Sequence, residues 1–235
     1  MDATSTGYRK RPAGSVTLRV LGALLTYPDA SLRDSLGEMA GLLAQERSLR
    51  PARAQEVQAL IAALQRASAL DAEAAYVELF DRGRATSLHL FEHVHGDSRE
   101  RGPAMIDLAQ TYERAGLYLA EGELPDYLPA VLEFASTQPT ASARAFLGEI
   151  AHLLKVVFGE LLRRESAYAS VLGALIEMAG EKAEAGPSIP EPPLDESWAE
   201  PVVFDGCSTQ GQARPGQPQP IRIVPKSALT QGTAP

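Results

Sequence analysis

The sequence has a single cysteine, no long apolar run and no excess of basic charge, and each of these absences argues against a class of protein. Cys207 is the single cysteine among 235 residues, which excludes an intramolecular disulfide and a cysteine-rich zinc or iron–sulfur site. No uninterrupted apolar run reaches the roughly 18–20 residues that cross a bilayer. The formal net charge of −8 disfavours both a general nucleic-acid surface and electrostatic docking on an anionic membrane. We therefore predict no nucleic-acid partner and no insertion into a membrane.

The N-terminal region resembles a secretion signal at first sight. The basic residues 9–11 precede the apolar stretch 16–25. However, Arg19 interrupts that stretch, and residues 26–29 follow it without a cleavage site of small residues. We expect the stretch to be the first helix of a cytoplasmic protein, a location that a single free thiol also favours.

Apolar residues recur at helical spacing through most of residues 16–184. The longest regular stripe consists of Phe146, Ile150, Leu153, Leu154, Val157 and Leu161. No stretch alternates apolar and polar residues as a half-buried strand does. The sequence therefore predicts an all-α fold, with a single helical-bundle domain over residues 16–184 after a flexible N-terminus, residues 1–15.

Several residues predict where the helices begin. Asp29 or Ser31 is expected to cap the second helix, and Asp71 the helix that carries Tyr76. Pro51 suits the first turn of another helix. Asp126 is well placed as the cap of the helix that follows the segment 124–129.

The C-terminal residues 185–235 differ in composition from the rest of the chain. Ten of the 17 prolines lie between Pro187 and Pro235, and residues 210–220 consist mostly of Gly, Gln and Pro. Such a segment buries too little apolar surface to offset its ordering entropy, so we predict a disordered tail. Within it, Trp198 and the apolar residues 202–204 form a patch that either docks on a protein surface or stays solvated.

A histidine-rich segment is the first candidate for function. Between residues 80 and 101 lie three of the four histidines, together with several acidic and basic residues. If this segment is helical up to Gly96, His89 and His93 share a face, and a metal-dependent enzyme would use His89, Glu92, His93 and His95. The sequence lacks both the His-Glu-x-x-His motif and the Gly-x-Ser-x-Gly elbow, and it has no phosphate-binding glycine loop. Because these motifs are absent, the sequence gives no support to hydrolytic catalysis or nucleotide binding.

A second candidate is a peptide-binding surface. Residues 124–129 combine leucine, proline and tyrosine, and Glu121, Glu123 and Glu133 surround them. Carboxylates beside an apolar groove favour a peptide with basic residues next to apolar anchors. The alternative is that these acidic residues only cap and solvate the starts of helices. The residues alone thus lead to an acidic, helical, cytoplasmic protein without an evident catalytic apparatus.

Longer motifs add a resemblance to a known family. The sequence is similar to the NarJ family, the nitrate reductase delta subunits, which are molybdenum cofactor assembly chaperones of the wider TorD and DmsD type. The segments that carry the similarity are residues 76–81, residues 87–102 with Phe-Glu-His-Val-His-Gly-Asp at their centre, residues 124–134, residues 24–29 and residues 195–204.

The resemblance implies a non-catalytic role without a cofactor or metal of its own. Proteins of this family bind the N-terminal segment of the apo form of the nitrate reductase alpha subunit in the cytoplasm while the molybdenum cofactor is inserted. Cofactor delivery proteins are possible further partners. A chaperone of this kind is absent from the mature enzyme, whereas a permanent structural subunit, the remaining alternative, would be present in it.

The resemblance also implies a peptide-binding site. The Tyr-x-x-Leu-Phe motif of the wider family falls on Tyr76, Leu79 and Phe80, and its Asp-His-Leu motif falls on residues 126–128, where Tyr127 replaces the histidine. The site residues expected from the resemblance are Tyr76, Leu79, Phe80, Asp81, His93, His95, Arg99, Asp126, Tyr127 and Pro129.

Overall fold

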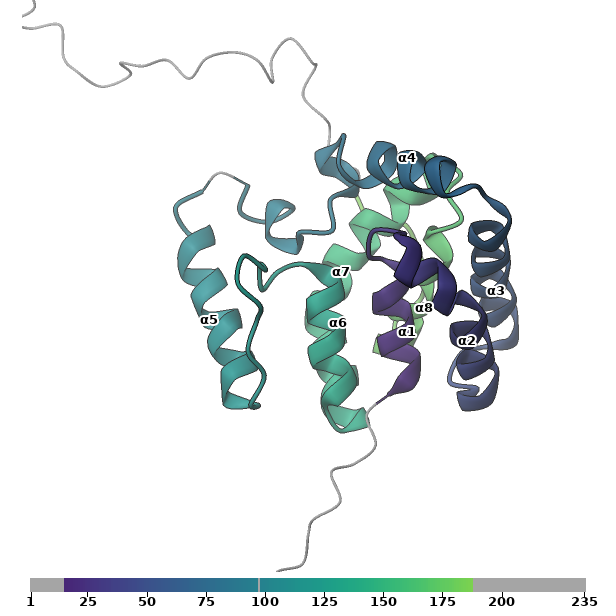
Figure 1. Cartoon of the computed structure of the whole chain (residues 1–235). Helices are drawn as coiled ribbons and strands as arrows, with labels where there is room; N and C mark the ends of the chain where they lie inside the picture. Colours follow the sequence, from purple (N-terminus) through teal and green to yellow (C-terminus); the bar gives the residue numbers. More distant parts are fainter. Residues whose placement is uncertain (1–14, 97, 188–235) are drawn as a thin grey trace, which may run out of the picture. The chain divides into compact units, whose positions relative to one another are not determined.

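The computed structural model describes residues 15–96 and 98–187, and these residues form an all-α fold (Figure 1). The helices are α1 (Val16–Leu24), α2 (Ala30–Glu46), α3 (Pro51–Arg66), α4 (Ala69–Phe80), the short 3-10 helices η1 (Arg84–Thr86) and η2 (Leu90–Glu92), α5 (Arg101–Arg114), α6 (Leu128–Thr137), α7 (Thr140–Arg163) and α8 (Ala169–Ala179). Extended pairing within the described residues is limited to one antiparallel bridge between His89 and Tyr127. The predicted fold class is confirmed, while the predicted tail lies outside the described residues except for its first three, 185–187.

Polar side chains start three of the helices. Ser15 accepts a hydrogen bond from the backbone of α1, and Asp29 accepts one from Leu32 N at 2.8 Å at the start of α2, as predicted. The cap of α4 is Ser68 and not Asp71, which lies one turn into the helix and itself bonds the serine. The prediction for Asp126 is also wrong, because α6 begins after Tyr127 without a side-chain cap.

The core lies where α1 packs between α2, α6 and α8 and where α7 packs along α8. In α7, Leu147, Leu154 and Leu161 are spaced by seven residues, and each is at most 1% exposed. Gly22 allows α1 to approach α6 closely, since a Cβ at this position would lie 3.2 Å from the Leu132 Cβ. Apolar burial of this kind contributes about 25 cal/mol per Å² and supplies most of the driving force for folding.

Polar contacts attach α3 to its neighbours. The Arg53 guanidinium donates to Glu177 Oε1 from Nε at 3.2 Å and from Nη2 at 2.9 Å, which joins α3 to α8. From α2, Arg33 donates to the backbone oxygens of Leu64 and Ala67 at the end of α3. These carbonyls have no partner within their own helix, so the arginine provides one. The end of α3 is thereby held beside α2 and the start of α4.

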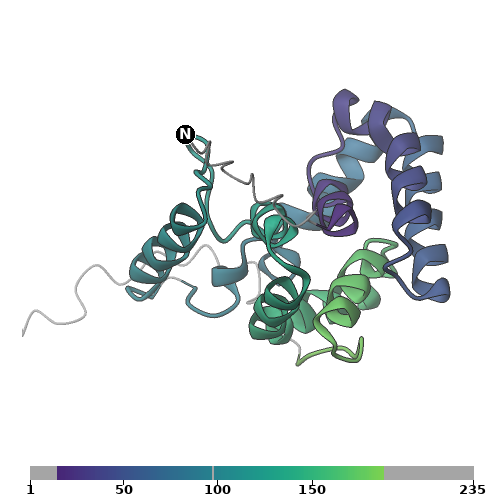
Figure 2. The same ribbon diagram turned by 90° about the horizontal axis from the view of Figure 1, so that it is seen from below.

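Helix α5 has few contacts with the rest of the fold. In Figures 1 and 2 it stands at the edge, next to the segment that follows it and on the far side of α6 from α1. Tyr112 is its only buried residue. The Tyr112 ring packs on Phe134 with centroids 4.8 Å apart, and its hydroxyl donates to Pro125 O at 2.8 Å. One aromatic side chain therefore provides most of the attachment of α5.

The last described residues return along α7. Gly180 ends α8 with φ of 91°, and Gly186 N donates to Lys155 O at 2.8 Å. Gly159 makes room for this segment, because a Cβ there would lie 3.1 Å from the Ala185 Cβ.

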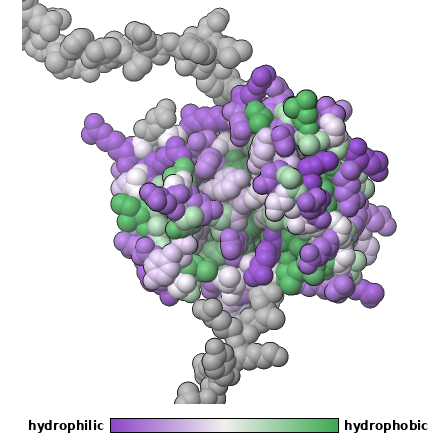
Figure 3. Space-filling model, in the orientation of Figure 1, coloured by the Kyte–Doolittle hydropathy of each residue, from purple (hydrophilic) through white to green (hydrophobic). Residues whose placement is uncertain are grey.

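The face of the molecule in Figure 3 mixes hydrophobic and hydrophilic residues. No helix among the described residues is both long and apolar enough to cross a membrane.

The histidine-rich segment is not an α-helix. It contains the two short 3-10 helices η1 and η2, and η2 is followed by turns in which His93 N bonds Leu90 O and His95 N bonds Phe91 O. His89 precedes η2 in extended conformation, so it does not share a helix face with His93. The reason is tertiary: Leu90 N donates to the backbone oxygen of Asp126 instead of to a helical partner.

Candidate functional site

Four aromatic side chains and a carboxylate surround a pocket between the end of α1, α4 and the segments 87–89 and 126–128. We call it the tyrosine pocket. Its volume is about 300 Å³, which is room for on the order of one or two amino-acid side chains. Its lining residues are Tyr27, Tyr76, Phe80, Asp81, Ser87, Leu88, His89 and Tyr127.

One wall is a cluster of rings around Tyr76. Tyr76 and Phe80 lie four residues apart on α4 and therefore share a face, with ring centroids 4.8 Å apart. Tyr27 meets Tyr76 edge to face, with centroids 5.7 Å apart and an interplanar angle of 85°. The Tyr76 hydroxyl donates to Leu25 O at 2.8 Å. Tyr76 is thereby held rigidly, whereas Tyr27 is 43% exposed at the mouth of the pocket.

The opposite wall is the antiparallel pair formed by residues 88–90 and 126–128. Leu90 N donates to Asp126 O at 3.0 Å, and Leu128 N donates to Leu88 O at 2.8 Å. His89 and Tyr127 sit opposite each other in this pair, with ring centroids 5.3 Å apart. The Tyr127 hydroxyl lies 3.5 Å from that of Tyr76, which connects the two walls.

Asp126 lies behind this wall and not in the pocket. Its side chain is fully buried, and Oδ2 accepts a hydrogen bond from Phe91 N at 3.1 Å. Oδ1 is 3.4 Å from Nδ1 of His89, and Oδ2 is 3.9 Å from the Arg101 guanidinium. A buried carboxylate requires such partners, so Asp126 fixes the start of η2 and the orientation of His89.

The pKa values of His89 and His93 are shifted in opposite directions. The hydrogen bond to Asp126 raises the pKa of His89, although partial burial acts in the opposite direction. Burial lowers the pKa of His93, whose Nε2 lies 2.8 Å from Ser87 O. Because a carbonyl only accepts, Nε2 carries the proton of a neutral His93. His93 therefore supports the loop from inside, while His89 lines the pocket.

The pocket offers aromatic faces, hydroxyl groups and one acidic edge. Burial raises the pKa of Tyr76 and of Tyr127, so both hydroxyls are protonated at neutral pH. Asp81 is exposed at the rim. Aromatic faces next to a carboxylate attract apolar and cationic side chains. This chemistry suits recognition of a peptide.

The described part of the chain contains no group of three or more His, Cys, Asp or Glu side chains that could hold a metal ion. The histidines of the metal-enzyme alternative have other partners: His89 faces Asp126, His93 bonds Ser87 O, and the ring of His95 packs against Phe91. That alternative is not supported.

The structure distributes the predicted peptide-binding residues over several places. Tyr76, Phe80, Asp81 and Tyr127 meet in the tyrosine pocket, whereas Leu79 lines a separate groove beside α3.

The other predicted residues do not line the pocket. Pro129 is buried in the first turn of α6, and Arg99 is exposed before α5. His93 and His95 belong to the loop around η2, and Asp126 stands behind the wall.

Sequence reasoning missed four lining residues as peptide contacts. Tyr27 lies within the motif 24–29, which carries part of the family resemblance but points to no site by itself. His89 had been considered only as a metal ligand. Ser87 and Leu88 carry no signal of their own, because only the pairing with residues 126–128 brings them to the pocket.

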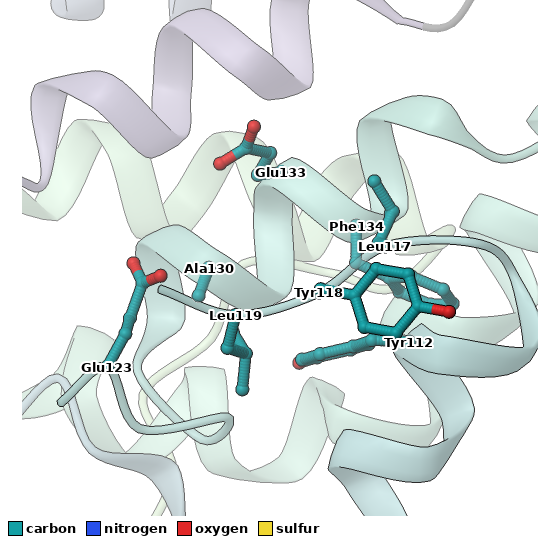
Figure 4. Close-up of a pocket in the computed structure, with 8 residues that line it drawn as sticks. All are labelled: Tyr112, Leu117, Tyr118, Leu119, Glu123, Ala130, Glu133 and Phe134. Atoms are coloured by element: carbon teal, nitrogen blue, oxygen red, sulfur yellow. The ribbon is translucent and has the colours of Figure 1, made fainter. Parts of the chain in front are cut away.

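A smaller hollow of about 80 Å³ lies between the end of α5, the segment after it and α6 (Figure 4). It is lined by Tyr112, Leu117, Tyr118, Leu119, Glu123, Ala130, Glu133 and Phe134. Glu123 and Glu133, two of the acidic residues around the predicted peptide surface, line this hollow, but none of the site residues expected from the family resemblance does, so the tyrosine pocket remains the candidate site.

Comparison with known proteins identifies the family. The family model described as nitrate reductase delta subunit matches residues 46–164. The chain is 44% identical over 164 residues to the nitrate reductase molybdenum cofactor assembly chaperone NarJ of Escherichia coli K12, covering 70% of each chain. It is 40% identical over 163 residues to the probable chaperone NarW of the same organism, covering 69% of this chain and 68% of NarW. A probable NarJ of Bacillus subtilis is 32% identical over 164 residues, covering 68% of this chain and 86% of the relative. The chain belongs to the nitrate reductase delta subunit family.

Proposed function

We propose that this protein is a chaperone for molybdenum cofactor assembly in a nitrate reductase. The observation that carries the proposal is the 44% identity over 164 residues to a relative of that name. The protein acts by binding its client and catalyses no reaction of its own. Its place of action is the cytoplasm, where the client is completed.

The client form that it binds is the alpha subunit before cofactor insertion, and the contact is the N-terminal segment of that subunit. A chaperone that binds the unfilled enzyme in preference to the filled one raises the population of the unfilled form by mass action. Once the cofactor has been inserted, the client enzyme no longer presents the surface that the chaperone binds, so the contact ends.

The tyrosine pocket supports this binding mode. It has a rigid aromatic wall and an exposed carboxylate, which together fit an apolar anchor with a basic neighbour. Aromatic side chains are often hot spots of an interface, residues that contribute a large share of its binding free energy.

Calorimetry with a peptide from the N-terminus of the alpha subunit tests the site. Tyr27→Ala should weaken binding by about tenfold, or about 1.4 kcal/mol, because it removes the ring at the mouth of the pocket. Tyr118→Ala is the matched control, since Tyr118 is 80% exposed and lies outside the pocket. Equal losses for the two variants would remove the pocket from the proposal.

A deletion strain tests the function itself. Without the protein, nitrate reductase should accumulate without molybdenum and without activity, and the full chain should restore both. The protein should be absent from the purified mature reductase. Normal molybdenum content in the deletion strain, or a stoichiometric amount of this chain in the mature enzyme, would contradict the proposal.

A further inference from the structure

Two of the three glutamates around the segment 124–129, Glu123 and Glu133, line the hollow between the end of α5, the segment after it and α6 (Figure 4). We call it the acidic hollow. Its volume of about 80 Å³ equals that of two or three water molecules, at roughly 30 Å³ each. The hollow therefore has room for the end of one side chain and not for a peptide backbone.

A small residue on α6 creates this space. Ala130 lies three and four positions before Glu133 and Phe134, so these three residues share one face of the helix. The Ala130 methyl group leaves room that a longer side chain would fill. Phe134 and Tyr112, whose ring centroids are 4.8 Å apart, supply a buried aromatic wall. The hollow thus combines rings in a fixed position with a carboxylate on the same helix.

The backbone after α5 holds Glu123 at the hollow. Gly116 ends α5 with φ of 80°, and further on Glu123 N donates to Ala120 O at 3.1 Å to close a turn. Ala120 N donates in return to Glu123 Oε2 at 3.3 Å. Burial raises the pKa of Tyr112, and the charges of Asp126 and Glu123 add to this effect. The Glu123 carboxylate is therefore near enough to act electrostatically on a ring that lines the hollow.

The described part of the chain does not neutralise the charge of the hollow. Among the residues that line it, none is Lys, Arg or His. Glu123 and Glu133 are both exposed, and neither forms an ion pair within residues 15–96 and 98–187. Figure 4 shows these two side chains toward one end of the hollow and the rings of Tyr112 and Phe134 toward the other. Carboxylates beside aromatic rings attract a cation.

A guanidinium group fits this arrangement better than an ammonium group. It is planar and can lie against a ring, and its five N–H groups can reach two carboxylates at once. An ammonium group is more strongly hydrated and gives up more on leaving water. We infer that the acidic hollow binds an arginine side chain of a partner protein. This contact is separate from the tyrosine pocket and does not depend on the proposed function.

An arginine in the hollow would join two parts of the fold that are weakly connected. Glu133 belongs to α6, whereas Glu123 belongs to the segment that follows α5. A guanidinium paired with both would add to the attachment that Tyr112 provides. At a ligand concentration ten times the Kd, amide hydrogens of α5 should exchange about tenfold more slowly, because the helix must release the ligand before it detaches.

A short peptide tests the inference. The probe is acetyl-Gly-Ser-Arg-Ser-Gly-amide, which has no apolar anchor for the tyrosine pocket. Its titration into the full chain, labelled for NMR, should shift the backbone amides of residues 117–123. The same peptide with citrulline keeps the shape of arginine without its charge, and it should bind about fivefold more weakly because two exposed ion pairs are lost. The lysine peptide should bind more weakly than the arginine peptide.

Matched variants locate the site. With Glu123→Gln and Glu133→Gln combined, the arginine and citrulline peptides should bind equally, because the carboxylates are lost while the size of the side chains is kept. Glu113→Gln with Glu121→Gln is the control, since both residues are exposed, neither lines the hollow, and the net charge changes equally. The control should keep the preference of about fivefold for arginine.

Four results would overturn the inference. They are equal affinities of the wild type for the arginine peptide and for either replacement, an undiminished preference in the variant of the hollow, amide shifts confined to other parts of the chain, and no binding at tens of millimolar peptide. Slower exchange of the α5 amides with the arginine peptide, and not with the citrulline peptide, would support it.

Discussion

Substitutions of Asp126 can distinguish two roles for this residue: holding the loop around η2 in place and contacting a client. Its carboxylate is fully buried and accepts the backbone N–H of Phe91, while His89 and Arg101 lie within 4 Å. Asp126→Ala removes the acceptor and leaves the Phe91 N–H without its partner. Asp126→Asn keeps an oxygen for that N–H, but it loses the negative charge and replaces the second acceptor oxygen, which faces His89, with an NH2 group.

The magnitudes follow from the contacts. An unsatisfied buried donor costs about 1–3 kcal/mol, and the lost interaction with His89 adds about 1 kcal/mol. The Arg101 pair is long, at 3.9 Å, and adds little. Asp126→Ala should therefore destabilise the fold by about 2–4 kcal/mol, and Asp126→Asn by about 1–2 kcal/mol. For a domain of this size, the alanine variant should melt about 5–15 °C lower.

Urea unfolding at neutral pH measures these differences as shifts of the midpoint at constant slope. Asp107→Asn, an exposed position on α5, serves as the control and should change stability by less than about 0.5 kcal/mol. The asparagine variant of Asp126 should bind the client peptide nearly as well as the wild type. An alanine variant as stable as the control would refute the structural role, and an asparagine variant that is stable but cannot bind would show direct contact instead.

Three further changes test other parts of the fold. The raised pKa of His89 means that its charged form stabilises the fold. This contribution is fully present below the unfolded pKa of about 6.5 and is lost as the pH rises through the folded pKa. His89→Gln should therefore lower the free energy of unfolding more at about pH 5.5 than at about pH 9. Urea midpoints at the two pH values check this, and an equal cost would contradict it. Glu177→Ala should cost about 1–3 kcal/mol because it removes the carboxylate, 15% exposed, that joins the Arg53 guanidinium of α3 to α8. Glu56→Ala removes the other carboxylate paired with Arg53, which is 54% exposed on the same helix, and should cost less than about 0.5 kcal/mol in the same assay. Leu154→Ala should cost about 2–5 kcal/mol at a fully buried position, against less than about 1 kcal/mol for Leu162→Ala, which is 48% exposed on the same helix; thermal unfolding distinguishes them, and similar losses would argue against the packing described.

The sequence predicts the helices well because their signal is local. The repeat of leucines at 147, 154 and 161 places one face of α7 in the core without any knowledge of its partners. The shared face of Tyr76 and Phe80 is predictable in the same way, because residues four apart on a helix lie on the same face. Half of the tyrosine pocket follows from this rule and from the family motifs.

The other half depends on contacts between distant parts of the chain. The pairing of segments 88–90 and 126–128 joins His89 and Tyr127, which lie 38 positions apart, and no local sequence pattern predicts it. Asp126 illustrates the consequence: its type suits a helix cap, but the remote N–H of Phe91 takes its carboxylate. The condition that the histidine segment is helical fails for the same reason, because a hydrogen bond from Leu90 N to the distant Asp126 replaces one of a helical turn.

The attachment of α5 through Tyr112 has a consequence for how the molecule opens. A helix held by one buried ring needs little free energy to detach, far less than the cooperative unfolding of α1, α6, α7 and α8. Backbone amide hydrogens of α5 should therefore exchange with solvent after local unfolding of this helix. Those of α7 and α8 should exchange only when the whole domain unfolds. Within residues 15–96 and 98–187, a protease would for the same reason cut first near the exposed residues 120–124, and the remaining helices would keep their core after the cut.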